Sequence, residues 1–314
     1  MLPNLRNNFF RFTPPLFRVY GKKSLKIWRR ICSRALNRTI TKESLISDFF
    51  RQGIMKDDVV IVHSSLSKLG DVKDGATTVI EALLDSVGKA GTIVVPTFCS
   101  AKTGPGDYLK NSPPYFDART TPSEVGKISE VFRNYPNAMR SCHPTHSVAA
   151  IGPHAEFIVS SHHAGETPFD RFSPFYKILE LDGKWLFLCV DIDKFTIYHV
   201  FEDLCENFPF SIYYDDPLLV RVIDMNGEEK FVKSKLHRKD LASIRIDNEK
   251  SKIVINRVRK RFEEMNILKS GQTGIYLSYL IRAKEGLDAL FTLLDQGETI
   301  YLSQKEQKKL RIFR

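Results

Sequence analysis

The sequence has few cysteines, and their placement excludes the usual cysteine-based stabilising sites. Only five occur among 314 residues: Cys32, Cys99, Cys142, Cys189 and Cys205. The number is odd, the spacing is wide and no C-x-x-C pair is present, so neither a disulfide framework nor a cysteine zinc site is indicated. This usage fits a reducing cytosol best. The length and the 42% hydrophobic content are enough to bury a large core, as one big α/β domain or two small ones.

Long uncharged apolar runs are lacking as well. No run of about 18 such residues occurs, and the N-terminal region has no apolar stretch followed by a small-residue cleavage site. We therefore expect neither a membrane span nor secretion, and we expect a cytoplasmic protein.

Acidic residues are absent from the first 40 positions, which carry ten of the 47 Lys and Arg residues. The rest of the chain holds 37 basic and 37 acidic side chains, so the pI of 9.3 comes from this segment. We divide the chain into a basic N-terminal extension, residues 1–40, and an α/β domain, residues 41–314. No basic stretch interleaved with aromatic residues recurs in the neutral body, so nucleic acid is not an expected partner.

Within the extension, the stretch SLKIWRRICSRALNR has the spacing of a basic amphipathic helix. One stripe of it is mainly apolar: Leu25, Trp28, Ile31, Cys32, Ala35 and Leu36. Two roles fit this pattern. The helix binds an anionic membrane surface or an acidic partner, which would place the protein at the inner face of the membrane, or it packs on the main domain.

The chain from residue 41 onward alternates predicted strands and helices. A helix over 42–52 is expected first, with Thr41 as a plausible N-cap. Buried strands within 57–66 and 91–98 then flank a helix over 75–88, and this order predicts a βαβ unit.

A Gly- and Pro-rich loop follows over residues 100–120, and ordered loops of this length usually serve a site. The next helix is predicted to start with Thr121 as N-cap, Pro122 at the first position and Glu124 in the first turn.

The C-terminal half continues the sheet and then changes its pattern. Short apolar runs at 147–152 and 184–190 predict strands, and a helix is expected within 191–209. Alternation around Asn226-Gly227 indicates a hairpin, and helical stretches follow near 252–266 and 282–297. We therefore expect an α/β core with a C-terminal α+β elaboration.

Titratable side chains gather at the predicted strand ends and on the turns that follow them. They are His63, His143, His146, Asp170, Asp191, Asp193, His199 and Glu202. His199 and Glu202 lie at i and i+3 of one predicted helix and share a face. An imidazole accepts a proton near neutral pH and a carboxylate orients it, so the set suits general-base catalysis, although each histidine alone also fits a structural role.

A metal site is the alternative interpretation of these side chains. Three pairs supply zinc-type ligands: His143 with His146, His162 with His163, and His199 with Glu202. None of the pairs has a recognised metal-binding spacing, so we predict no metal.

Six stretches, taken in order, resemble the signature series of the aminoglycoside 3-N-acetyltransferase family. They are VIVHSSLSKLG, GTIVVPTF, FDARTTPSEVGKISEVFR, AMRSCHPTHSVAAIGPHA, FSPFYKILELDGKWLFLCV and TIYHVFED, and the likeness covers roughly residues 41–210. The resemblance implies an enzyme that acylates an amine by direct transfer from acetyl-CoA. It also implies a three-layer α/β sandwich with a central mixed sheet.

The same resemblance assigns catalytic roles. The histidine of the R-S-x-H-P-x-x-S pattern falls on His143 and the glutamate of the H-x-x-E pattern on Glu202, so these two are expected to form the general base, with His146 in support. A primary ammonium is not a nucleophile, so a base must take its proton before the amine attacks the thioester. The third acidic residue is assigned to Asp170, with Glu166 as the competitor.

The coenzyme is expected to bind at further positions that resemble the family's pantetheine and phosphate contacts. These are His63, Ser64, Ser65, Leu66, Thr97, Ser147 and Ser173. Hydroxyls and strand-end amides at such positions donate hydrogen bonds to the coenzyme, although each of these serines also fits a turn or a helix cap.

The acceptor amine is the least constrained part of the expected reaction. Residues 99–103 contain one lysine, and no acid follows until Asp107, which is a poor surface for a polycation. We therefore expect an amino sugar or related amine of polysaccharide or secondary-metabolite biosynthesis, with aminoglycoside resistance as the alternative. A metal-dependent hydrolase and a membrane-associated protein that has lost catalysis are the other classes considered.

Overall fold

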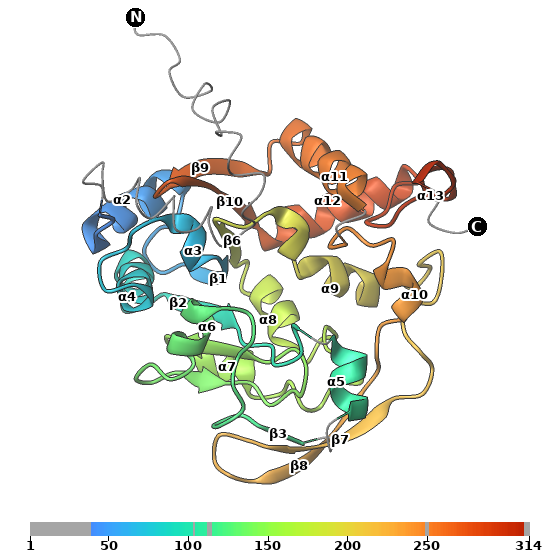
Figure 1. Cartoon of the computed structure of the whole chain (residues 1–314), viewed down its shortest axis with the longest axis horizontal. Coiled ribbons are helices and arrows are strands. Elements are labelled where there is room, and N and C mark those ends of the chain that lie inside the picture. The colour runs from blue at the N-terminus through green and yellow to red at the C-terminus, as the bar shows by residue number, and fades with distance from the viewer. Residues whose placement is uncertain (1–38, 103, 112–114, 249–250, 311–314) are drawn as a thin grey trace, which may run out of the picture.

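The computed structural model describes residues 39–102, 104–111, 115–248 and 251–310 (Figure 1). The amphipathic helix predicted in the first 38 residues lies outside this part, so the extension and its boundary at residue 40 stay predictions. Within the described ranges, no helix is long and apolar enough to cross a bilayer.

A mixed sheet of seven strands forms the centre of the described chain, in the order β4-β5-β2-β1-β6-β10-β9. The three middle strands, β2, β1 and β6, run parallel, and the other pairings are antiparallel. The strands are β1 (Val59–Ser64), β2 (Thr92–Pro96), β4 (Met139–Arg140), β5 (Val148–Ile151), β6 (Lys184–Leu188), β9 (Lys269–Thr273) and β10 (Tyr276–Arg282). Sequence analysis did not predict β9 and β10, which extend one edge of the sheet.

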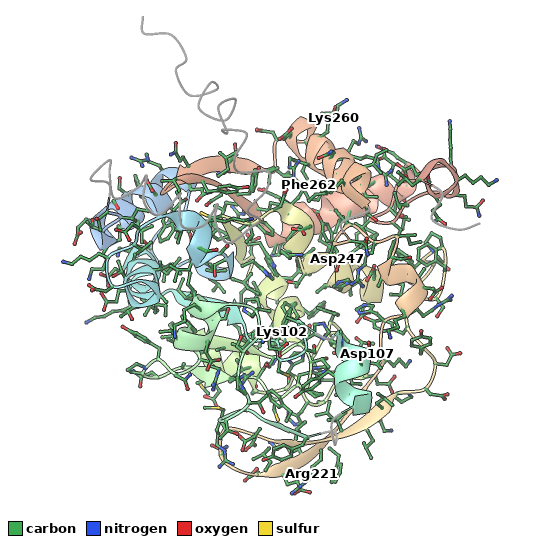
Figure 2. The ribbon with its side chains drawn as sticks, in the orientation of Figure 1. Lys102, Asp107, Arg221, Asp247, Lys260 and Phe262 are labelled. Carbon is green, nitrogen blue, oxygen red and sulfur yellow. The ribbon has the colours of Figure 1, made fainter. Side chains whose placement is uncertain are left out.

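Helices cover both faces of this sheet, because the central strands are apolar on both sides. In β1, Val60 and Val62 pack into the core on one face, while Val59 and Ile61 pack into the core on the other. The first face is covered by α2 (Lys42–Gln52), α4 (Ala76–Val87) and α6 (Lys127–Phe132). The second face is covered by α7 (Ala155–Val159), α8 (Pro174–Glu180), α9 (Ile197–Leu204), α11 (Lys252–Glu264) and α12 (Ala283–Asp295). Phe262 of α11, labelled in Figure 2, is one of the side chains of this core. The predicted three-layer α/β sandwich is confirmed.

A second sheet of three strands, β3-β7-β8, lies apart from the first, at the bottom of Figure 1. β7 (Leu218–Ile223) and β8 (Glu229–Ser234) form the hairpin predicted around Asn226-Gly227, where Gly227 has a φ of 86°. β3 (Tyr115–Asp117) comes from the long loop and pairs in parallel with β7. The C-terminal α+β elaboration is therefore present, and it reaches back to the loop after β2.

One predicted helix start is wrong. The helix expected to begin at Thr121 begins at Lys127, with Gly126 at its N-cap. The Thr121 hydroxyl accepts a hydrogen bond from the Asp117 amide (2.9 Å), and the Glu124 carboxylate accepts one from the Lys102 amide (2.9 Å), so both side chains brace the loop.

The start of α2 is as predicted, since Thr41 caps it in a reciprocal capping box. The other helices of the described ranges are α3 (Leu66–Leu69), α5 (Pro105–Asn111), η2 (Ile192–Lys194), α10 (Lys239–Ala242) and α13 (Gln304–Leu310).

Candidate active site

A cavity of about 780 Å³ opens at the carboxyl ends of β1 and β2, where ligands bind in many α/β sheets. His63, Ser64 and Ser65, at the end of β1, line it as three of the predicted coenzyme residues. Ser100, Ala101 and the first turn of α5 form another wall. Asp107 of α5 faces the same cavity as Asp247, which follows α10, and both are labelled in Figure 2. The position of these residues in the cavity wall agrees with the prediction that the long loop serves a site.

The cavity also contacts a cluster built on Glu202 of α9. Oε2 of Glu202 lies 2.7 Å from Nδ1 of His199 and 3.7 Å from Nε2 of His237. Oε1 of Glu202 accepts a hydrogen bond from the Tyr301 hydroxyl (2.6 Å). Burial acts to raise the pKa of Glu202, but the two imidazoles outweigh it and hold that pKa well below its usual range. Glu202 is thus an ionised carboxylate that orients His199.

The aromatic ring of Phe169 is packed against several of these side chains. Its centroid lies 4.6 Å from that of His199, 4.9 Å from that of His146 and 5.7 Å from that of His237. All three histidines line the 780 Å³ cavity, and Phe169 lines both this cavity and a second one of about 620 Å³. The histidines therefore stand next to the wall between two cavities.

His143 occupies a different place from the one expected of the catalytic base. Its Nδ1 accepts hydrogen bonds from the backbone amides of Thr145 (3.3 Å) and His146 (3.2 Å), which assigns its proton to Nε2, 3.5 Å from the Ser234 hydroxyl. The ring is stacked on His162 at 4.5 Å and does not line either cavity. Burial, followed by its histidine neighbours, holds the pKa of His143 well below its usual range.

The structure therefore brings Glu202 together with His199 and His237 rather than with His143. His143 braces the turn that carries His146, whose Nδ1 is 2.8 Å from the Thr145 hydroxyl. The catalytic role predicted for His143 stays a prediction, and no hydrogen bond in the described part of the chain links it to Glu202.

The two candidates for the third acidic residue both line the smaller cavity. The Asp170 carboxylate accepts hydrogen bonds from the backbone amides of Glu166 (2.9 Å) and Phe172 (3.0 Å), so it caps its own loop. Gly165 is needed there, because a Cβ at this position would come within 2.5 Å of both Asp170 oxygens. The Glu166 carboxylate lies 3.6 Å from Lys235 Nζ.

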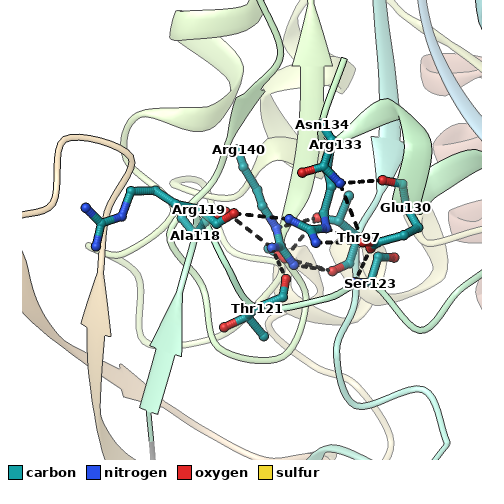
Figure 3. Close-up of polar contacts among 10 residues, drawn as sticks. Thr97, Ala118, Arg119, Thr121, Ser123, Glu130, Arg133, Asn134 and Arg140 are labelled. Carbon is teal, nitrogen blue, oxygen red and sulfur yellow. Dashed lines mark hydrogen bonds and ion pairs between the residues drawn. The ribbon is translucent and has the colours of Figure 1, made fainter. Parts of the chain in front are cut away.

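Three of the predicted coenzyme hydroxyls are used inside the protein. Thr97 and Ser147 hydrogen-bond to each other (3.0 Å), and Arg140 Nε donates to both hydroxyls, at 3.0 and 3.2 Å. Figure 3 shows Arg140 beside Thr97. Ser173 is the N-cap of α8 and accepts the Tyr176 amide. None of the three lines the large cavity, and neither does Leu66, the first residue of α3. For these four residues, the expected contact with the coenzyme is not supported by their position.

Sequence reasoning missed several members of the site. His237 and Tyr301 reach Glu202 from far along the chain, beyond the motifs at residues 41–210. Asp203 was also missed: its carboxylate accepts a hydrogen bond from the Tyr213 hydroxyl (2.7 Å) and contacts the Thr167 hydroxyl, and burial raises its pKa to about 7. A lone histidine in KLHRKD and a tyrosine in ETIYL carry no signal of this kind.

His199, Glu202 and His237 are the one group of three or more suitable side chains, among the described residues, whose donor atoms could hold a metal ion. These atoms lie within 4.8 Å of one another.

Comparison with known proteins gives one consistent result. The family model described as aminoglycoside 3-N-acetyltransferase matches residues 61–295. An aminoglycoside N(3')-acetyltransferase-like protein, YokD, from Bacillus subtilis (strain 168) is 35% identical over 176 residues, which are 52% of this chain and 64% of that protein. Aminoglycoside N(3)-acetyltransferase IV from Salmonella sp is 34% identical over 188 residues, 58% of this chain and 67% of that protein.

A solved structure of similar architecture is the apoenzyme of aminoglycoside acetyltransferase AAC(3)-IVa. It has a TM-score of 0.67 and 26% identity, and the match covers 87% of this chain and 97% of that one. The family model spans well over half of the described fold, from β1 to the end of α12. The chain belongs to the aminoglycoside 3-N-acetyltransferase family, whose co-substrate is acetyl-CoA.

Proposed function

We propose that this chain transfers the acetyl group of acetyl-CoA to an amino group of a polycationic amino sugar of the aminoglycoside class, an activity that confers antibiotic resistance. The observation that carries the proposal is the pair of adjoining cavities with opposite charge. Membership of the family supports it, and so do related structures that hold the expected ligands. AAC-IIIb has been solved with CoASH, and a histidine-to-alanine mutant of AAC(3)-IVa with a gentamicin.

The larger cavity fits an anionic coenzyme. Five basic side chains line it against three acidic ones, and the basic ones are Lys68, Lys194, Arg238, Lys239 and Arg245. His63 also lines this cavity, and its buried Nε2 has no hydrogen-bond partner among the described residues. A coenzyme phosphate is attracted by the excess of positive charge, and a pantetheine amide supplies the missing partner for His63.

The smaller cavity fits a cationic acceptor. Five acidic side chains line it against two basic ones, and the acidic ones are Glu166, Asp170, Glu202, Asp203 and Asp215. The sequence-based preference for a biosynthetic amine rested on the lack of acids at residues 99–103. The structure supplies carboxylates from other segments, so that argument against a polycation no longer holds. No observation supports the biosynthetic role, and we propose the resistance alternative instead.

His199 is the residue we propose as the general base. Its Nδ1–H donates to Glu202, which leaves Nε2 with a free electron pair on a side chain that lines the larger cavity. His199 takes a proton from the acceptor ammonium, and the neutral amine then attacks the thioester carbonyl. The C–S bond breaks as the C–N bond forms, the acylated nitrogen releases its extra proton to solvent, and the coenzyme leaves as a thiolate that takes the proton held by His199. Glu202 stabilises the imidazolium between these steps.

The test is a thiol-release assay with acetyl-CoA across a panel of aminoglycosides and amino-sugar nucleotides. We expect turnover with the aminoglycosides. Asp215→Asn, which removes one carboxylate of the smaller cavity, is expected to raise KM for an aminoglycoside several-fold and to leave KM for acetyl-CoA unchanged.

Two results would contradict the proposal. One is turnover confined to the nucleotide-linked sugars. The other is an equal KM for aminoglycosides in Asp215→Asn and in Glu229→Gln, a matched control on the exposed face of β8. Binding of acetyl-CoA is tested separately, because a ligand that binds only the folded state raises Tm by mass action.

A further inference from the structure

The cluster of His199, Glu202 and His237 has a composition that proton transfer alone does not require. A single carboxylate is enough to orient one imidazole, yet a second imidazole faces the same oxygen of Glu202. His237 Nε2 lies 3.7 Å from that oxygen, beyond hydrogen-bond distance, and is a buried nitrogen with no hydrogen-bond partner in the described part of the chain. Two imidazole nitrogens and one carboxylate oxygen thus converge on one small volume.

This donor set is the one that zinc takes in many proteins. Two histidines and a glutamate bind catalytic zinc in a tetrahedral arrangement with bonds of about 2.0–2.2 Å, so neighbouring donor atoms lie roughly 3.3 Å apart. Here the two separations from Glu202 Oε2 are 2.7 Å and 3.7 Å. Shifts of about half an ångström in side-chain position bring both to the required value.

The surroundings of the cluster also suit a bound cation. The Tyr301 hydroxyl donates a hydrogen bond to Oε1 of Glu202, which fixes the carboxylate plane and leaves Oε2 as the oxygen that faces both histidines. Arg245, a cation that interacts electrostatically with His237 and Glu202, has its guanidinium paired with the Asp247 carboxylate at 2.8 and 3.0 Å. Both histidines line the larger cavity, so an ion can enter from it and keep a water as its fourth ligand.

We propose that His199, Glu202 and His237 form a binding site for Zn²⁺, and that the ion inhibits acyl transfer. Inhibition follows from the tautomer of His199. As the base, His199 carries its proton on Nδ1 and its electron pair on Nε2. A zinc ion takes the electron pair of Nδ1, so the neutral ring must adopt its other tautomer, in which its single proton sits on Nε2. The electron pair that accepts the substrate proton is then lost.

The inhibition rests on the proposed function, whereas the binding does not, so the two are measured separately. Chelator-treated full-length protein is titrated with Zn²⁺ by calorimetry and with Co²⁺ by absorbance. We expect one site per chain and a cobalt spectrum without a sulfur charge-transfer band, which excludes the cysteines as ligands. His237→Gln removes one ligand and is expected to weaken binding at least tenfold, whereas Tyr301→Phe, which loosens the carboxylate, weakens it less.

The matched control is His163→Gln, because His163 is a half-exposed histidine that lines neither cavity. Its zinc affinity is expected to equal that of the unaltered protein. Zinc is then added to the thiol-release assay at a concentration equal to the measured Kd. The rates of the unaltered protein and of His163→Gln should fall by half. The rate of His237→Gln should stay close to its own rate without zinc. If His237→Gln does not fold, His199→Gln serves in the binding measurement.

The site would be overturned if His237→Gln, or His199→Gln where it is used instead, bound zinc as tightly as the unaltered protein. A lack of saturable zinc binding to the unaltered protein would overturn it as well. Saturable binding at this site with undiminished acyl transfer would overturn the inhibition. If no acyl transfer is found with any amine, the proposed function fails, while the calorimetric and cobalt results still decide whether the site exists.

Discussion

Nδ1 of His199 lies 2.7 Å from Oε2 of Glu202, one turn further along α9. The Glu202 side chain has no exposed surface, while 16% of the His199 side chain is exposed. One helical turn therefore joins an accessible imidazole to a buried carboxylate, and the rigid helix fixes the distance between them. This relationship gives His199 the tautomer and the charge stabilisation that a general base needs.

The first prediction concerns this pair. His199→Gln and Glu202→Gln are each expected to lower kcat by about 10²–10⁴-fold, the usual contribution of a positioned general base. The double variant should be little worse than the more damaging single variant, because the two groups act as a unit. Thiol release at saturating acetyl-CoA and aminoglycoside measures this, with circular dichroism to check folding. Turnover near that of the unaltered protein in both single variants would remove the pair from the mechanism.

The second prediction separates His143 from His199. His143→Ala is expected to lower the free energy of unfolding by about 2–4 kcal/mol, because two backbone amides lose their acceptor and a buried ring leaves a void. Its kcat, corrected for folded protein, should fall less than that of His199→Gln. Denaturant unfolding and single-turnover rates on the same samples provide the comparison. A variant of unchanged stability with a kcat reduced at least as far as that of His199→Gln would instead support the sequence-based assignment of His143 as the base.

The order of elements was predictable from sequence because local signals specify it. Apolar runs and turn residues placed β1, β2 and β6, and Thr41 and Asn226-Gly227 marked a helix start and a hairpin. The start of α6 was missed because Thr121 and Glu124, which resemble a cap and a first-turn acid, make loop hydrogen bonds instead. When a side chain suits two local roles, the tertiary contacts around it determine which role it takes.

The site was only partly predictable for a related reason. The i, i+3 spacing placed His199 and Glu202 on one helix face, as the structure shows, but the motif series assigned His143 as the partner of Glu202. Thr97 and Ser147 resemble ligand-binding hydroxyls in the sequence, but in the folded chain both accept hydrogen bonds from Arg140. His237 and Tyr301 come from the C-terminal elaboration, so only the folded chain reveals that they contact Glu202.

The third prediction is the acid sensitivity of the folded state. Burial lowers the pKa of His63 and of His162 to about 3, and that of His237 to about 4. The unfolded chain binds protons on these histidines near pH 6.5, and the folded chain does not. Their stabilising contribution is therefore present above about pH 6.5 and is lost as the pH falls from there towards 4. Tm should fall steadily between pH 7 and pH 5, and a Tm that is flat or rises over this interval would contradict the assignment.

The fourth prediction concerns Asp203, which acts in the opposite direction. Burial raises its pKa to about 7, so the folded state binds a proton that the unfolded chain releases near pH 4. Its stabilising contribution is present below pH 4 and is lost as the pH rises through 7. Asp203→Asn, a neutral side chain of the same shape, should therefore gain stability relative to the unaltered protein as the pH rises from 5 to 8. The difference in Tm between the two proteins, measured across this range, checks it. A difference that does not change with pH would show that Asp203 is ionised throughout.

The last prediction concerns the basic extension, residues 1–40, which lies almost entirely outside the described residues. If it binds membranes, each Lys or Arg near an anionic bilayer contributes about 1 kcal/mol, and Trp28 adds interfacial burial. The full chain should then sediment with anionic but not with neutral liposomes, and salt should release it. Deletion of residues 1–38 should abolish sedimentation and leave acyl transfer intact, because the α/β domain begins at the cap of α2.

The alternative is that the amphipathic stripe packs on the α/β domain and buries Trp28, Ile31 and Leu36. In that case the truncated protein loses stability or solubility, and the composition of the liposomes has no effect on the full chain. Equal sedimentation of the full-length and truncated proteins would rule out membrane binding through the extension. A full-length protein that stays in the supernatant, combined with a truncation of lower Tm, would establish the packed helix, since only that arrangement ties the stability of the domain to the extension.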